Sequence, residues 1–232
     1  MTYLATDDDT ALASEFAQMG EADLAKAEPG LKELGLHDAY TAAVSAVQEA
    51  RSAGAKAQNE IRSAAENLDI AEAGRADRQR KAYEAGTTAI DEHAKATAAI
   101  VDTARTKLTA ACTPQEPTNA AERAELRSEV RMVLDAAKDA EDAVLSLLIG
   151  PDRGVAAVVA GSYGKRWLAS RGVKVDADMQ KAMDAALVAG AAAHGTPEEK
   201  RAAAALGRGG AIESLQKGIG VSLGGAKTFL GK

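Results

Sequence analysis

Apolar and small residues recur every seven positions in the segment that follows residue 38. One set of positions holds Tyr40, Val47, Gly54, Ile61 and Leu68, and a second set holds Ala43, Ala50, Ala57, Ala64 and Ala71. A seven-residue repeat places both sets on one side of a helix, as in the seam of a coiled coil. Alanine along one edge of the seam lets a partner helix approach closely. The pattern therefore predicts a long helix with a narrow, alanine-lined contact face.

The repeat loses its phase after residue 72, where Arg75 and Arg78 would fall on the seam. It resumes out of phase on Ile90, Ala94, Thr97, Val101, Ala104, Leu108 and Ala111. Such a break indicates either a stutter in one long helix or a turn that makes a helical hairpin. Gly74 and Gly86 would permit a turn, but no proline interrupts residues 38–112. We favour a continuous or bent helix and keep the hairpin as the alternative.

Proline and glycine divide the remainder of the chain. Asp9 or Thr10 is expected to cap a first helix that ends near Ala27, because the following Pro29-Gly30 pair disfavours continuation. A short helix around residues 31–34 would then precede the long segment. Two prolines lie in Thr113–Pro117, and proline breaks a helix and favours extended neighbours. We therefore place a proline linker at residues 113–118.

The C-terminal half shows shorter helical patterns. Asn119 with Glu122 is a variant capping box for a helix that continues to about Ile149. The last 83 residues hold 15 of the 21 glycines, and further helices are expected at about 153–170, 177–193, 197–206 and 211–229. The predicted fold is all-α. Residues 1–112 form an elongated, coiled-coil-like long helix or hairpin, and residues 119–232 a compact Gly/Ala-rich helical bundle.

Composition changes the picture in one respect. The chain has 55 alanines and only 3% aromatic residues. Alanine favours helix but buries little apolar area, so each contact stabilises the fold only slightly. Such a chain gains stability over long helical contacts or from contacts with other chains. A high-GC genome would produce the same alanine content.

Charge is distributed unevenly along the chain. Residues 1–40 carry nine Asp and Glu against two Lys, whereas residues 150–232 carry twelve Lys and Arg against seven acids. This asymmetry suits head-to-tail contacts between copies, or a basic end resting on an anionic partner. Chance would also produce it.

Compartment signals are few. The single cysteine, Cys112, cannot form an internal disulfide and favours a reducing compartment. The N-terminus does not resemble a secretory signal, and no apolar run is long enough to span a bilayer. We expect a cytoplasmic protein, or one within a virus particle assembled in the cytoplasm.

Catalytic and metal-binding patterns do not stand out. His37, His93 and His194 lack the repeated i, i+3 or i+4 partners of a helical metal site. Glycine-rich stretches such as Gly207–Gly210 lack the Gly-Lys-Ser/Thr ending of a phosphate loop. We therefore predict no enzyme activity, no metal and no cofactor.

Two basic clusters are the candidate partner-binding residues. One holds Arg75, Arg78, Arg80 and Lys81 at the phase break. The other holds Lys165, Arg166 and Trp167, which is the only tryptophan. The first would suit phosphates or an acidic protein surface, although a solvated helix face would show the same pattern. The second combines charge with an aromatic ring, a pairing enriched at interfaces, but Trp167 would serve equally as the core anchor of its helix. Residues 211–232 are amphipathic and would suit a membrane surface or a partner's groove.

These observations favour a non-catalytic structural or assembly subunit of a large multi-protein particle, which contacts copies of itself and other subunits. A minor capsid or head–tail protein of a bacteriophage virion is one concrete version. The alternatives are a membrane-active or ejected helical protein that uses its Gly-rich C-terminal region, and an adaptor that contacts nucleic acid.

Overall fold

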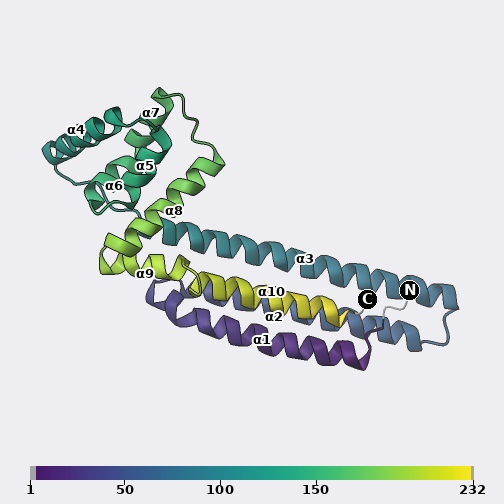
Figure 1. Ribbon diagram of the computed structural model, residues 1–232. Helices are drawn as coiled ribbons and strands as arrows, with labels where there is room; N and C mark the ends of the chain where they lie inside the picture. The colour runs from purple at the N-terminus through teal and green to yellow at the C-terminus, as the bar shows by residue number, and fades with distance from the viewer. Residues whose placement is uncertain (1–3, 231–232) are drawn as a thin grey trace. The chain divides into compact units, whose positions relative to one another are not determined.

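The structure is a computed structural model that describes residues 4–230, and all regular secondary structure in that range is helical (Figure 1). The predicted all-α class is confirmed. The helices are α1 (Asp7–Glu33), α2 (His37–Glu66), α3 (Glu72–Ala111), α4 (Ala120–Ala136), α5 (Ala140–Ile149), α6 (Arg153–Ala160), α7 (Ser162–Ser170), α8 (Ala177–His194), α9 (Pro197–Leu206) and α10 (Ala211–Phe229). None of these helices is both long and apolar enough to cross a membrane.

The helices group into two units. Unit 1 takes the described residues up to Ala104 together with those from Gly209 onward, and unit 2 is Arg105–Arg208. The predicted regions, 1–112 and 119–232, do not coincide with these units. The difference arises because α10 packs along α1 and α2 (Figure 1) and because the last turns of α3 group with unit 2.

In unit 1, α1 is longer at both ends than predicted. Thr6 caps it, in a reciprocal pair with Asp9, and the helix continues through Pro29 to Glu33. The predicted stop near Ala27 is wrong, because the fully buried Leu31 holds the turn after the proline in the core. The chain leaves the helix at Gly35, whose φ of 69° suits glycine.

The preference for one continuous helix across residues 38–112 is also wrong. Helix α2 ends at Glu66, and the Asn67 side chain accepts a hydrogen bond from the Asp69 backbone nitrogen at 3.1 Å. This local bond competes with helix continuation. Helix α3 then returns antiparallel to α2. Two contacts show this direction: a Cβ at Gly86 would meet the Cβ of Ala57, and further along α3, His93 Nδ1 lies 3.5 Å from Glu49 Oε2.

Most predicted seam positions are nevertheless buried. They include Ala43, Val47, Ala50, Ala57, Ile61 and Ala64 on α2, and Ile90, Thr97, Val101, Ala104 and Leu108 on α3. Leu68 is 84% exposed because it follows the end of α2. The seven-residue pattern therefore identifies the buried face of each helix.

Glycines allow α10 to approach α1 closely. A Cβ at Gly218 would lie 2.8 Å from the backbone nitrogen of Leu24 and 2.9 Å from the carbonyl oxygen of Gly20. Asp23 is buried beside this contact and forms an ion pair with Lys217 of α10 at 3.1 Å. Most apolar residues of α10, among them Ile212, Leu215 and Ile219, are buried within unit 1.

Unit 2 is a cluster of shorter helices around larger side chains. The predicted helix from Asn119 to Ile149 is divided at Asp139, which caps α5 by accepting from the Asp142 backbone nitrogen at 2.9 Å. The predicted helix 153–170 is divided at Gly161. The core contains Val130, Leu134, Val144, Leu148, Val158, Val159, Trp167, Leu168, Met183 and Leu187.

Candidate functional site

A groove of about 590 Å³ lies between α4 and α7 in unit 2. It is lined by Ala124, Arg127, Ser128, Arg131 and Asp135 from α4, and by Tyr163, Arg166, Trp167, Ser170 and Arg171 from α7 and its C-terminal cap. The spacing explains the lining, since residues three and four apart share one face of a helix. The adjoining face of α4 carries Val130 and Leu134 into the core.

Asp135 lies at one end of the groove and holds three donors. One carboxylate oxygen accepts from Trp167 Nε1 at 3.1 Å and from Arg171 Nη2 at 3.0 Å, and the other accepts from Arg131 Nε at 3.3 Å. The hydrogen bond from Trp167, followed by those from Arg171 and Arg131, lowers the pKa of Asp135 below its ordinary value of 3.8. Asp135 therefore remains an anion that fixes the orientation of these side chains.

Trp167 serves both the core and the groove. It is only 9% exposed and packs in the core of unit 2, as a helix anchor does. Its ring also lies beneath the Arg171 guanidinium, whose central carbon is 5.2 Å from the ring centroid, and cation–π attraction favours this position. The largely buried indole ring of Trp167 therefore forms part of the groove lining at this end, against Arg171.

The other two arginines are held less tightly. Arg127 forms an ion pair at 2.9 Å with Glu116, which lies in the proline-rich segment. Arg166 donates to the backbone carbonyl and the hydroxyl of Ser162 at 3.2 and 3.3 Å. Four guanidinium groups thus share the groove with Asp135 and with the Glu116 carboxylate, which leaves it positively charged. Guanidinium groups bind carboxylates and phosphates in two-pronged geometry.

The sequence identified part of this groove. Arg166 and Trp167 line it, whereas Lys165 donates to Gln180 at 2.9 Å and is not among the lining residues. Sequence reasoning missed Arg127, Arg131 and Arg171. The four-residue spacing of Arg127 and Arg131 was a usable signal, since it places both on one face of α4.

The other basic cluster belongs to unit 1, at the start of α3. Arg75 donates to the Ile70 carbonyl at 2.9 Å, and Arg80 and Lys81 each pair with Asp77 at 2.7 Å. Hydrogen bonds from Lys81 and then Arg80 lower the pKa of Asp77. Arg78 and Lys81 line a hollow of about 870 Å³ between α2 and α3. Much of the charge of this cluster is therefore engaged within unit 1.

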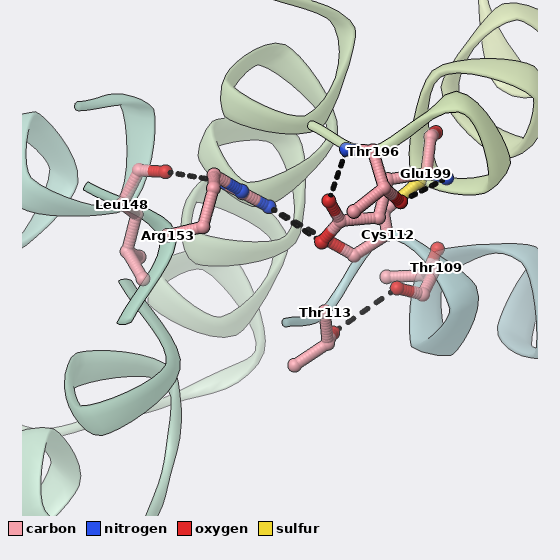
Figure 2. Close-up of polar contacts among 7 residues, drawn as sticks. All are labelled: Thr109, Cys112, Thr113, Leu148, Arg153, Thr196 and Glu199. Atoms are coloured by element: carbon pink, nitrogen blue, oxygen red, sulfur yellow. Dashed lines mark hydrogen bonds and ion pairs between the residues drawn. The ribbon is translucent and has the colours of Figure 1, made fainter. Parts of the chain in front are cut away.

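A second polar cluster, buried in unit 2, surrounds Arg153 (Figure 2). Arg153 donates to the carbonyl oxygens of Cys112 at 2.8 Å and Leu148 at 3.2 Å, and lies 3.5 Å from a Glu199 oxygen. The other Glu199 oxygen accepts from the Thr196 backbone nitrogen at 2.7 Å, as part of the cap of α9. These bonds tie the end of α3 to α5, α6 and α9.

Cys112 is an inert member of this cluster. Its side chain is buried, and burial, with a smaller contribution from the Glu199 charge, raises the pKa of the thiol from 9.0 to about 11. Because the thiolate is the reactive form, Cys112 is a poor nucleophile at neutral pH. The Arg153 cluster therefore serves the packing of unit 2.

Comparisons with protein families, with curated proteins and with solved structures found no match to this chain.

Proposed function

We propose that this chain is a non-catalytic structural subunit of a multi-protein assembly, and that the α4–α7 groove is a surface through which it binds acidic protein partners. The groove carries this proposal. It combines four arginines with Tyr163 and Trp167, and arginine, tyrosine and tryptophan are the residues most enriched at interface hot spots. A minor capsid or head–tail component of a bacteriophage virion is the concrete setting that we propose.

The interior of unit 1 supports the same proposal. Its buried positions are mostly alanine and glycine, including Ala27, Ala43, Ala50 and Gly54. Small side chains remove little apolar area from water when they are buried. Long helices whose contacts bury so little apolar area gain stability when neighbouring subunits cover more of their surface.

The two alternatives have weaker support. A membrane-active role for residues 211–232 requires α10 to leave α1 and α2, which bury its apolar residues. A nucleic-acid adaptor would use the same arginines on phosphates, but Tyr163 and Trp167 share the groove lining with them, and arginine combined with aromatic residues is enriched at protein interfaces.

The fluorescence of Trp167 can report binding to the groove, because Trp167 is the only tryptophan in the chain and lines the groove. The full-length protein is titrated with poly-L-glutamate and, separately, with a short DNA duplex while Trp167 emission is recorded. We expect polyglutamate to change the emission at low salt, and the response to weaken as salt screens the charges.

Two variants locate the response. Arg127→Ala combined with Arg166→Ala should abolish it, whereas Lys165→Ala, next to Arg166 but outside the lining, should retain it. A response that survives the double variant, or none to polyglutamate, would overturn the proposal. Tighter binding of the DNA duplex than of polyglutamate would favour the nucleic-acid adaptor instead.

A further inference from the structure

The outward face of α1 carries an acidic and apolar stripe. Asp8, Leu12, Glu15 and Met19 follow one another at intervals of four, three and four residues, which places them on one side of the helix. Both carboxylates are exposed, and Leu12 and Met19 are 42% and 47% exposed. The opposite side of α1 carries Ala13, Gly20 and Leu24 into unit 1. These four residues are called the α1 stripe below.

The α4–α7 groove has the complementary chemistry. Its arginines would pair with acidic side chains, and the Tyr163 and Trp167 rings line the same groove. Met132, which follows Arg131 on α4, is 67% exposed at the edge of the same face. An acidic helix with interspersed Leu and Met therefore finds charge for its carboxylates and apolar contact for its remaining side chains.

The two surfaces also agree in length. The stripe from Asp8 to Met19 and the groove lining from Ala124 to Asp135 each span eleven residue steps of a helix. At 1.5 Å per residue, both extend over about 16 Å. A helix lying along α4 would therefore present its whole stripe to the groove.

Charge on the two units adds a long-range attraction between copies. By sequence, the portion assigned to unit 1 has 13 Lys and Arg against 20 Asp and Glu, whereas unit 2 has 15 against 14. The acidic unit of one copy is therefore drawn toward the arginines of another, and such complementarity accelerates association and fixes its orientation.

We propose that the α4–α7 groove of one copy binds the α1 stripe of a second copy. The proposal rests on the proposed function and names its partner. Each copy carries one groove and one stripe, and the two are different surfaces. The contact is therefore heterologous, so it propagates head to tail into a ring or an open chain.

Two variants, each with one surface disabled, test this arrangement in the full-length protein. The groove variant is Arg127→Ala with Arg166→Ala. The stripe variant is Glu15→Lys with Met19→Gln, which are exposed mid-helix positions that tolerate a good helix former. Circular dichroism checks that each variant is folded, and Glu92→Lys, an exposed acid on α3, is the matched charge control.

Light scattering over a concentration series gives the result. We expect the mass of the unaltered protein and of Glu92→Lys to rise with concentration at low salt, and each disabled variant alone to stay monomeric. An equimolar mixture of the two disabled variants should form dimers and nothing larger, because one intact groove and one intact stripe remain.

Three results would overturn the proposal. If the unaltered protein stays monomeric while polyglutamate still changes Trp167 emission, the groove binds an acidic partner other than a second copy, and the proposed function stands. If the stripe variant associates like the unaltered protein, the α1 stripe is not the occupant. If neither association nor a polyglutamate response is found, the proposed function fails as well.

Discussion

Unit 1 and unit 2 fill their interiors with different side chains. The buried positions of α1 and α2 are mostly alanine and glycine, with Leu31 and Ile61 among the larger residues, whereas the core of unit 2 is built from Val, Leu, Met and Trp167. Unit 1 therefore depends on how closely its helix backbones approach one another. Unit 2 depends on the volume of its side chains and on filling the space between short helices.

The polar contacts differ in the same way. In unit 1, Arg51 pairs with Glu21 at 2.5 Å and Lys227 with Asp91 at 2.7 Å, and all four side chains are at least 35% exposed. In unit 2, Arg153 and Glu199 are 14% and 9% exposed. An exposed pair contributes little, whereas breaking a buried one leaves a charge without compensation. The two units should therefore respond differently to loss of an arginine.

The largest expected effect is that of Arg153→Met. It removes the donors to the Cys112 and Leu148 carbonyls and leaves the Glu199 carboxylate buried. We expect a loss of about 3 kcal/mol in the free energy of unfolding, measured by urea denaturation with Trp167 emission reporting on unit 2. Arg51→Met in unit 1 is the control and should cost less than about 1 kcal/mol, followed by circular dichroism. Equal losses would show that the comparison between the units is wrong.

Cys112 tests whether the interior of unit 2 excludes water. Its pKa of about 11, against an ordinary 9.0, leaves about a hundredfold less thiolate at pH 8. The native protein should therefore react with a thiol reagent at least about a hundredfold more slowly than the urea-unfolded chain, since burial also restricts access. The rate of iodoacetamide labelling at pH 8 measures this. Comparable rates in the two states would mean that the Arg153 cluster opens readily.

Gly218→Ala probes the close approach of backbones in unit 1. The added methyl group would meet backbone atoms of Leu24 and Gly20 at 2.8 and 2.9 Å, and backbone cannot move aside without separating α1 from α10. We expect a loss of about 2 kcal/mol, in the range for overpacking. Gly224→Ala on the same helix is the control. It has nothing within 4 Å of an added Cβ, so it should gain up to about 1 kcal/mol from helix propensity.

These glycines also show why the sequence predicted the elements better than their arrangement. The caps at Asn119, Asp176 and Thr196 were predictable, because a cap is a local hydrogen bond between near neighbours. The pairing of Gly20 with Gly218 joins residues far apart in the chain, and no periodicity reports it. The predicted helix end before Pro29 is wrong for the same reason. Burial of Leu31 outweighs the local cost of a proline inside the helix.

The candidate site follows the same rule. Arg166 and Trp167 were found because they adjoin in sequence, but the groove exists only where α4 faces α7. Arg171 is held in the groove by a hydrogen bond to Asp135, which lies 36 positions earlier in the chain. Local patterns therefore identified only Arg166 and Trp167 among the ten lining residues, and the packing of α4 against α7 supplied the rest.

The smallest expected effects concern two aspartates, one in each unit. Asp23 in unit 1 has its pKa lowered by hydrogen bonds from Lys26 and then Lys217, and Asp135 in unit 2 has its pKa lowered by Trp167, Arg171 and Arg131. A lowered folded-state pKa stabilises the protein above the ordinary value of 3.8. That stabilisation is lost as the pH falls through the folded-state pKa.

Salt should change the contributions of the two aspartates to stability by different amounts. Asp23 is buried, whereas the side chain of Asp135 is 44% exposed, so ions screen the contacts of Asp135 more effectively. Urea denaturation between about pH 5 and pH 2, at low and high salt, compares the unaltered protein with Asp23→Asn and Asp135→Asn. Each substitution should flatten part of the acid-induced loss of stability, and high salt should diminish the Asp135 contribution more than that of Asp23. If salt diminished the Asp23 contribution more, the Asp23 carboxylate between α1 and α10 would be open to solvent, and the backbone contact beside it at Gly218 would be looser than the distances indicate.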